Sequence, residues 1–198
     1  MVRKLVSHGL VVTSLALGGT ALLAPSAAAV DMTVRVISLN GSGCPTGTVS
    51  VMTSGSALRL TYSSFLAEFG PDTPQTDYRR NCQATLRVTG PSGSRYAVRT
   101  ANRSGYLVLP SNASATEKFS TYLSGQSGTV FTRVHSGPMD RLWSNENSVT
   151  PTVWSNCDTS QYLNVNEEAR VTRGGAAARA TGTMSVQQPV LYLLWQTC

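Results

Sequence analysis

Hydrophobic and polar residues alternate along most of the chain, which is the period-2 pattern of strands with one buried face. Glycine and proline separate these segments, as at Gly90-Pro91 and Gly137-Pro138. Short strands at intervals of roughly ten residues predict an all-β fold, an antiparallel β-sandwich of the jelly-roll type. The expected strands are 33–39, 48–51, 58–62, 84–88, 96–98, 106–109, 129–134, 152–154, 162–165, 168–171, 182–186 and 191–195.

A helical period is almost absent. The one hint of a helix is the segment 63–69, which is too short to decide the matter. The Gly- and Ala-rich segment 174–178 is expected to be a hairpin tip or a mobile loop. We find no internal repeat and no linker, so residues 30–198 are expected to form a single β-sandwich domain.

Residues 1–29 have the features of a secretory signal peptide. A positive start with Arg3 and Lys4 precedes an apolar stretch over 5–23, and small residues at 27–29 offer a cleavage site. A membrane anchor is the alternative because the apolar stretch approaches the length of a span. Polar residues interrupt it, however, and no basic flank follows. We therefore expect cleavage and an extracellular protein with no membrane span.

Four cysteines remain after that cleavage: Cys44, Cys82, Cys157 and Cys198. An even number in an exported chain is typical of two disulfides, for which three connectivities are open. We predict Cys44–Cys82 and Cys157–Cys198, because each pair joins motifs of similar kind across a comparable loop. The wide spacing argues against a zinc site, and no metal or cofactor is expected.

Catalytic chemistry has little support in the sequence. His135 is the only histidine after the signal segment, and no Gly-x-Ser-x-Gly motif accompanies it. A pair of carboxylates could hydrolyse glycosides, but acids in loops more often form turns and caps. The segment from Asp140 to Asn147 does not have EF-hand spacing and is interpreted as a polar surface loop. The acids expected in loops are Asp72, Asp77, Asp140, Glu146 and Asp158.

The basic residues indicate what kind of partner the protein meets. The exported region has 14 basic and 10 acidic residues, and all but one of the basic residues are arginine. Most of them fall singly on expected strands and only Arg79 and Arg80 are adjacent, so nucleic acid is not expected as a partner. An anionic envelope polymer fits better than DNA, although outward-facing strand arginines need no ligand at all.

The tryptophans divide into two kinds. Trp154 and Trp195 each stand three residues before a cysteine, so both indoles are expected to pack beside a disulfide in the core. Trp143 has polar neighbours and is expected to be an exposed platform that could stack on a sugar ring. The candidate ligand-binding residues are therefore Trp143, Arg79, Arg80, Asp140 and Glu146.

Four motifs occur in order along the exported region. The chain resembles a secreted domain-of-unknown-function family of bacteria and fungi, whose members are of about this length. That family shows Gly-x-Gly-Cys-Pro followed by a basic-basic-Asn-Cys motif, with Arg-Lys where this chain has Arg79-Arg80. The resemblance implies a secreted, disulfide-tied protein and implies no activity. The motifs are Asn40-Gly41-Ser42-Gly43-Cys44-Pro45, Arg79-Arg80-Asn81-Cys82-Gln83, Trp154-x-x-Cys157 and Leu194-Trp195-Gln196-Thr197-Cys198.

The sequence thus favours a secreted, non-enzymatic β-sandwich that binds an extracellular or envelope ligand, either a polysaccharide or another protein. One alternative is a small secreted hydrolase that uses loop carboxylates. Another is a protease inhibitor whose exposed loop is anchored by Arg79 and Arg80. The sequence does not indicate an oligomeric state.

Overall fold

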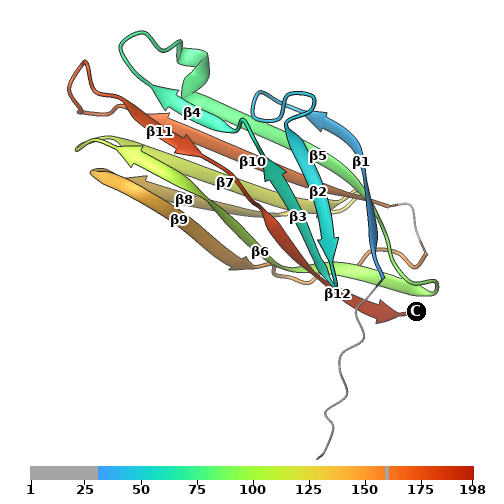
Figure 1. Ribbon diagram of the computed structural model, residues 1–198. Helices are drawn as coiled ribbons and strands as arrows, with labels where there is room; N and C mark the ends of the chain where they lie inside the picture. Colours follow the sequence, from blue (N-terminus) through green and yellow to red (C-terminus); the bar gives the residue numbers. More distant parts are fainter. Residues whose placement is uncertain (1–30, 159–160) are drawn as a thin grey trace, which may run out of the picture.

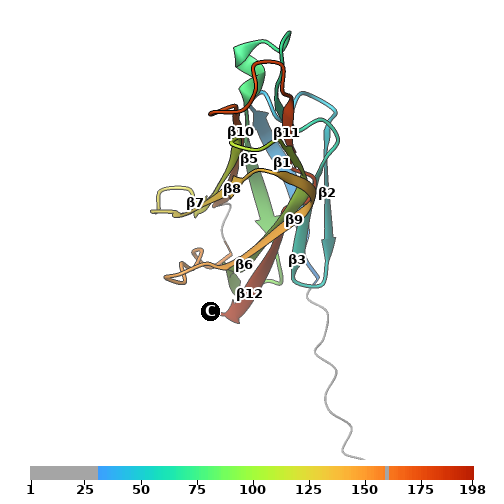
Figure 2. The ribbon, with the colours of Figure 1, turned by 90° about the vertical axis from the view of Figure 1, so that its left-hand side faces the viewer.

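The computed structural model describes residues 31–158 and 161–198, which form two antiparallel sheets packed face to face (Figure 1; Figure 2). The first sheet has the strand order β1-β5-β10-β7-β8. Its strands are β1 (Thr33–Asn40), β5 (Arg79–Thr89), β10 (Tyr162–Thr172), β7 (Ser114–Leu123) and β8 (Thr129–Ser136).

The second sheet has the order β2-β3-β12-β6-β11-β4, and β9 pairs along the other side of β6. A 3-10 turn, η1 (Gln75–Tyr78), leads into β5. The strands of this sheet are β2 (Val49–Ser54), β3 (Ala57–Tyr62), β4 (Leu66–Phe69), β6 (Ser94–Leu109), β9 (Met139–Ser148), β11 (Gly182–Ser185) and β12 (Val190–Thr197). The predicted all-β antiparallel sandwich is confirmed.

The core lies between the sheets because alternate residues of each strand point inward. In β3, Leu58 and Leu60 are fully buried while Arg59 between them is exposed. On the first sheet, Phe119 of β7 and Leu163 of β10 are fully buried in the same core. Burying an aliphatic or aromatic side chain of this size stabilises the fold by about 1.5–3 kcal/mol.

Both predicted disulfides are present. Cys44–Cys82 joins the turn after β1 to β5, with 5.4 Å between the Cα atoms. Cys157–Cys198 joins the segment before β10 to the last residue, with a Cα separation of 6.1 Å. Each bridge therefore ties a connecting segment or a chain end to the sandwich.

Several elements differ from the prediction. β6 is one continuous strand where two were expected, and β7, β9 and β4 were not expected at all. β4 replaces the helical hint at 63–69, and the predicted strand 152–154 is only a single bridge between Trp154 and Ala97. The predicted signal peptide, 1–29, lies outside the described residues. Within the described part of the chain, no helix is long and apolar enough to cross a membrane.

Candidate functional site

A groove of about 510 Å³ lies where the two sheets meet at β8 and β9. These are the edge strands of their respective sheets, and they follow one another in the chain. Side chains of both strands line the groove, including Arg133 and His135 from β8 and Arg141, Trp143 and Asn145 from β9. The groove thus exposes part of the space between the sheets at one side of the sandwich.

The groove is electropositive. Arg133 and Arg141 line it, and no acidic side chain is among its lining residues. Burial lowers the pKa of His135, the two arginines lower it further, and Glu117 opposes them. His135 is therefore neutral at pH 7, and its buried Nε2 has no hydrogen-bond partner among the described residues. The positive charge of the groove at pH 7 therefore comes from the guanidinium groups of Arg133 and Arg141.

Trp143 forms the floor of the groove and is only 5% exposed. Its indole Nε1 donates a hydrogen bond to the carbonyl oxygen of Ser185 at 3.1 Å, and its ring centroid lies 5.9 Å from that of His135. Gly105 lies opposite it on β6. A Cβ at Gly105 would come within 1.9 Å of the Ser185 carbonyl oxygen and 2.8 Å of the indole nitrogen. Glycine therefore leaves the room that the indole and β11 occupy.

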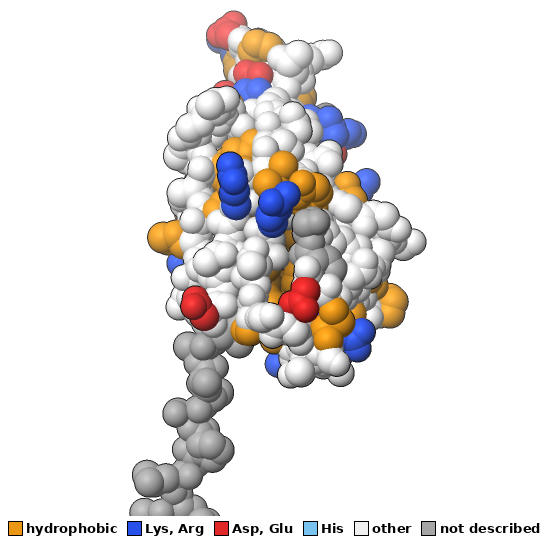
Figure 3. Space-filling model, turned by 90° about the vertical axis from the view of Figure 1, so that its right-hand side faces the viewer, with side chains coloured by type: hydrophobic (Ala, Val, Ile, Leu, Met, Phe, Trp, Pro, Cys, Tyr) orange, Lys and Arg blue, Asp and Glu red, His pale blue; other side chains and the backbone are white. Residues whose placement is uncertain are grey.

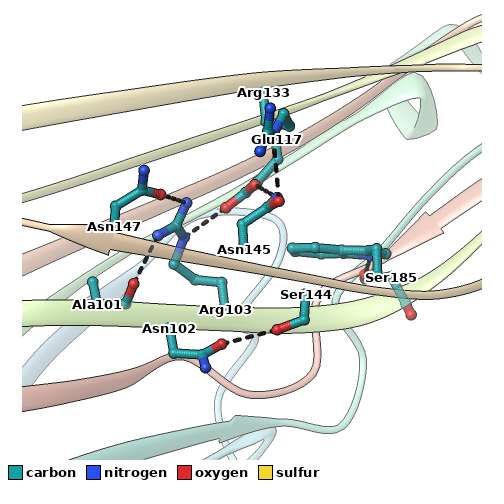
Figure 4. Close-up of polar contacts among 10 residues, drawn as sticks. Ala101, Asn102, Arg103, Glu117, Arg133, Ser144, Asn145, Asn147 and Ser185 are labelled. Atoms are coloured by element: carbon teal, nitrogen blue, oxygen red, sulfur yellow. Dashed lines mark hydrogen bonds and ion pairs between the residues drawn. The ribbon is translucent and has the colours of Figure 1, made fainter.

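Below this floor, an ion pair lies between the sheets (Figure 4). Nε of Arg103 donates to a carboxylate oxygen of Glu117 at 2.6 Å, and both side chains are 1% exposed. Arg103 also donates to the carbonyl oxygen of Ala101 at 3.1 Å and to Oδ1 of Asn147 at 2.9 Å. These bonds compensate much of the desolvation of a buried pair, and loss of either partner would leave an unpaired buried charge.

Asn145 connects the buried ion pair to the wall of the groove. Its Nδ2 donates to the second carboxylate oxygen of Glu117, and its Oδ1 accepts a hydrogen bond from Nε of Arg133 at 3.4 Å (Figure 4). The rings of Phe119 and Phe131 lie 4.7 Å and 5.7 Å from the guanidinium carbon of Arg103 and stabilise its charge. Glu117 therefore holds Asn145, and Asn145 holds Arg133.

A second buried carboxyl group, Glu167, has no such partner. It is 1% exposed, and neither of its carboxylate oxygens accepts a hydrogen bond among the described residues. Burial raises its pKa well above the usual range, Glu117 raises it further, and Arg103 partly offsets both. The buried hydroxyl of Tyr62 likewise has no hydrogen-bond partner in the described part of the chain, and its pKa is raised by burial and by Glu167. Glu167 is therefore neutral under conditions that ionise an ordinary glutamate.

Two of the predicted site residues lie away from the groove. Arg79 and Arg80 begin β5 instead of forming an exposed loop. Arg79 pairs with Glu168 at 2.6 Å, while Arg80 pairs with Asp77 at 2.9 Å and donates to the carbonyl oxygen of Leu66. The interpretation of this dipeptide as the anchor of a protruding inhibitor loop is therefore wrong.

The other three predicted residues lie on β9, which was expected to be a loop and is a strand. Trp143 is buried at the groove floor, so its prediction as an exposed platform is wrong. Asp140 accepts a hydrogen bond from the hydroxyl of Tyr106 at 2.6 Å, and this bond raises the pKa of Tyr106. Glu146 lines a separate depression. Of the predicted candidates, the structure brings only Trp143 into the groove.

The described residues contain no candidate metal centre. In residues 31–158 and 161–198, no three histidine, cysteine or acidic side chains are grouped so that they could hold a metal ion. The loop acids have different partners: Asp77 pairs with Arg80, and Asp158 accepts a hydrogen bond from the backbone of Gly93 at 2.6 Å.

The two tryptophans beside the second disulfide are half-buried. Trp195 packs against the core and lies 5.6 Å from the ring of Tyr96. Trp154 lies under the guanidinium group of Arg95, 5.2 Å away, and is not part of the core cluster. The core placement is therefore right in part for Trp195 and wrong for Trp154.

The end of the sandwich shown in Figure 3 has scattered charges on a largely uncharged surface.

Sequence reasoning missed three residues that line the groove, Arg133, Arg141 and Asn145, and the buried ion pair beneath it, Arg103 and Glu117. A usable signal was present for Glu117, since it alternates with buried Ala115 and Phe119. A charged residue at an inward position of a strand is uncommon and indicates a buried pair or a site. Its partner could not be identified because it lies on another strand.

Three comparisons with known proteins bear on this chain. Residues 30–198 match the family model described as "Domain of unknown function (DUF4360)". An "Uncharacterized secreted protein" from Arthroderma benhamiae is 32% identical over 172 residues, which is 82% of this chain and 70% of the relative.

Solved structures resemble the chain only distantly. A structure of TmCBM61 in complex with beta-1,4-galactotriose has a TM-score of 0.34 and 10% identity, covering 82% of this chain and 88% of that one. The enzymatically active domain of tailspike protein 4 of bacteriophage CBA120 has a TM-score of 0.29 and 7% identity, covering 86% and 20%. Likenesses at these scores support no inference about a ligand.

Proposed function

We propose that this secreted β-sandwich, which belongs to the DUF4360 family, is a non-enzymatic protein that binds an acidic extracellular polysaccharide in the β8–β9 groove. The observation that carries the proposal is that Arg133 and Arg141 both line a groove whose lining has no acidic residue. Carboxylate groups along a polymer suit guanidinium groups, which can form two parallel hydrogen bonds to one carboxylate.

The shape and polarity of the groove favour a polysaccharide over a peptide. Peptide sites usually have a deep apolar pocket for an anchoring side chain, whereas the large indole of Trp143 is already buried as the floor. The polar side chains along this groove are those of Arg133, His135, Ser136, Arg141, Ser144 and Asn145. Such side chains suit a ligand with hydroxyl and carboxylate groups at intervals along its length.

The buried network supports binding by holding one wall in place. Arg133 is oriented by Asn145, which is oriented by the Glu117–Arg103 pair. A guanidinium group that is already positioned loses less conformational entropy when the ligand arrives. Glu117 and Arg103 do not contact the ligand in this proposal; they affect binding by positioning Asn145, which positions Arg133.

The test is binding of the exported region, 30–198, to polygalacturonate and to its fully methyl-esterified form, which has the same backbone without charge. We expect binding to polygalacturonate alone, weakening with salt because it depends on ion pairs. Arg133→Gln and Arg141→Gln should each weaken binding about tenfold or more, since a charge-assisted hydrogen bond contributes roughly 1.5–3 kcal/mol.

The matched control is Arg59→Gln, which removes one positive charge from an exposed position of β3 outside the groove. It should leave binding nearly unchanged. An equal loss for all three variants would mean that net charge alone attracts the polymer, and the proposal would fail. Release of reducing ends from the polymer during incubation would instead favour the hydrolase alternative.

A further inference from the structure

The outer face of the first sheet carries an unusual group of side chains. Asn81 and Gln83 on β5, and Asn164 and Asn166 on β10, occupy alternate positions that point away from the core. The register places Asn166 beside Gln83. Asparagine is depleted in β-strands, where β-branched and aromatic residues fit better. Four amides at neighbouring positions of two strands therefore form an arrangement that strand propensity does not favour.

These amides belong to a continuous polar surface over three strands. Ser120 on β7 accepts a hydrogen bond from Nδ2 of Asn166 at 3.1 Å. Thr85 donates to Oδ1 of Asn164 at 3.0 Å, and Gln83 donates to the hydroxyl of Tyr122 at 3.4 Å. These bonds fix the side chains laterally. The surface is thereby ordered before any ligand binds.

Hydrogen-bonding capacity remains unused on this surface. Each amide has two N–H donors and a carbonyl oxygen that can accept two hydrogen bonds. Within residues 31–158 and 161–198, the side-chain carbonyl oxygens of Gln83 and Asn166 accept no hydrogen bond. Both residues are half-buried and line a hollow of about 220 Å³. The free acceptors therefore lie at a shallow depression of the sheet.

The middle of the surface is uncharged. Charged groups stand at its ends: Arg87 lies over the ring of Tyr162 at 5.4 Å, and at the opposite end Arg79 is paired with Glu168. The Arg79 hydrogen bond lowers the pKa of Glu168, so this pair stays ionised and its charges cancel. Lys118, opposite Glu168 on β7, adds one positive charge at that end of the hollow. A neutral, hydroxyl-rich ligand matches the amides, whereas a polyanion gains nothing at the centre.

We propose that this amide surface, formed by Asn81, Gln83, Asn166 and Ser120 and supported by the buried Asn164, is a second binding site that takes a neutral polysaccharide. The site is separate from the β8–β9 groove and stands independently of the function proposed there. β7 contributes to the amide surface, and its neighbour β8 lines the groove. A protein with both sites links an acidic polymer to a neutral one.

The experiment is affinity gel electrophoresis of residues 30–198 in gels that contain laminarin, xylan, galactan or hydroxyethyl cellulose. At least one of these neutral polymers should retard the protein. The double variant Gln83→Ala/Asn166→Ala should bind that polymer at least tenfold more weakly, which corresponds to about 1.4 kcal/mol. The matched control Thr61→Ala changes an outward position of β3 in the other sheet and should bind like the native chain.

Further variants and the thermal midpoint separate this proposal from the first one. Arg133→Gln should lose polygalacturonate binding and keep the neutral polymer, while the double variant should do the reverse. Native retardation by no neutral polymer, or equal retardation of the double variant, overturns the amide-surface proposal. A double variant with a lowered thermal midpoint is replaced by Gln83→Met, which keeps the length of the side chain and removes its free carbonyl oxygen. Unchanged binding of Gln83→Met also overturns the proposal.

Discussion

Glu167 is the residue at which the interior departs furthest from an apolar core. Its neighbours across the strands are Cys82 on β5 and Phe119 on β7, both buried. Glu117 lies nearby and is already paired with the buried guanidinium group of Arg103. Two carboxyl groups thus share one positive charge, and the one without hydrogen bonds remains protonated.

This arrangement predicts an unusual pH dependence of stability. The pKa of Glu167 is raised in the folded state above the value of about 4.3 for an unfolded glutamate. Below the unfolded pKa, the carboxyl group is protonated in both states. As the pH rises towards the folded pKa, unfolding releases a proton, so the group's contribution to stability is lost. The loss is about 1.36 kcal/mol for each pH unit crossed.

Glu167→Gln should remove this slope, because an amide of nearly the same shape does not ionise. Urea unfolding of the native chain and of the variant at pH 4, 6 and 8 measures the effect. The difference in unfolding free energy should shift in favour of the variant as the pH rises. Glu168→Gln is the control, since its carboxyl pKa is lowered and its slope has the opposite sign. Parallel curves for native chain and Glu167→Gln would contradict the assignment.

At the scale of elements, the alternating pattern predicted the strands with clean alternation and missed those without it. β9 has the sequence MDRLWSNENS, in which polar residues occupy both faces. β7 carries charges both inward, at Glu117, and outward, at Lys118. Both are strands because each pairs along its length with a neighbour, β9 with β6 and β7 with β10. That long-range pairing is not encoded in the local pattern.

The groove was missed for the same reason. Which strands become the edges of the two sheets depends on the order in which all strands pair, and the groove exists only because β8 and β9 are both edges. The sequence analysis did name Trp143 as a candidate. Its burial could not be predicted because it depends on the room left by Gly105 on the paired strand β6. Disulfide pairing was easier to predict because similar motifs mark the two ends of each bridge.

Gly105 on β6 provides a test of how closely β6, β9 and β11 approach. In Gly105→Ala, the new methyl group would overlap the carbonyl oxygen of Ser185 on β11. Overpacking of this kind costs about 1–3 kcal/mol, and the displaced indole of Trp143 should change its fluorescence. Ser104→Ala, at the adjacent half-buried position, is the control. Equal thermal midpoints for the two variants would show that the strands separate without cost.

At the scale of the whole molecule, the two disulfides fasten different parts of the sandwich. Cys44–Cys82 ties the segment after β1 to β5, an inner strand of the first sheet. Cys157–Cys198 fastens the end of the chain, and the backbone N–H of Cys198 also donates to the carbonyl oxygen of Gly93 at 2.8 Å. The last strand, β12, lies between β3 and β6 and so holds the second sheet together.

The double variant Cys157→Ser/Cys198→Ser should therefore affect one end of the molecule more than the rest. The chain-entropy model assigns about 4 kcal/mol to a bridge that closes a loop of this length. The thermal midpoint should fall, and hydrogen exchange should speed up at the end of β12, where Trp195 pairs with Tyr96. Exchange in β5 should change little, because the other bridge remains.

The companion variant Cys44→Ser/Cys82→Ser closes a loop of similar length and is the matched comparison. It should lower the thermal midpoint by a similar amount and leave the end of β12 protected, because that strand keeps its own bridge and its pairing with β6. The two variants together separate loss of chain constraint from local fraying. If both accelerate exchange at Trp195 equally, the second disulfide has no local role, and the bridge acts only on the unfolded chain.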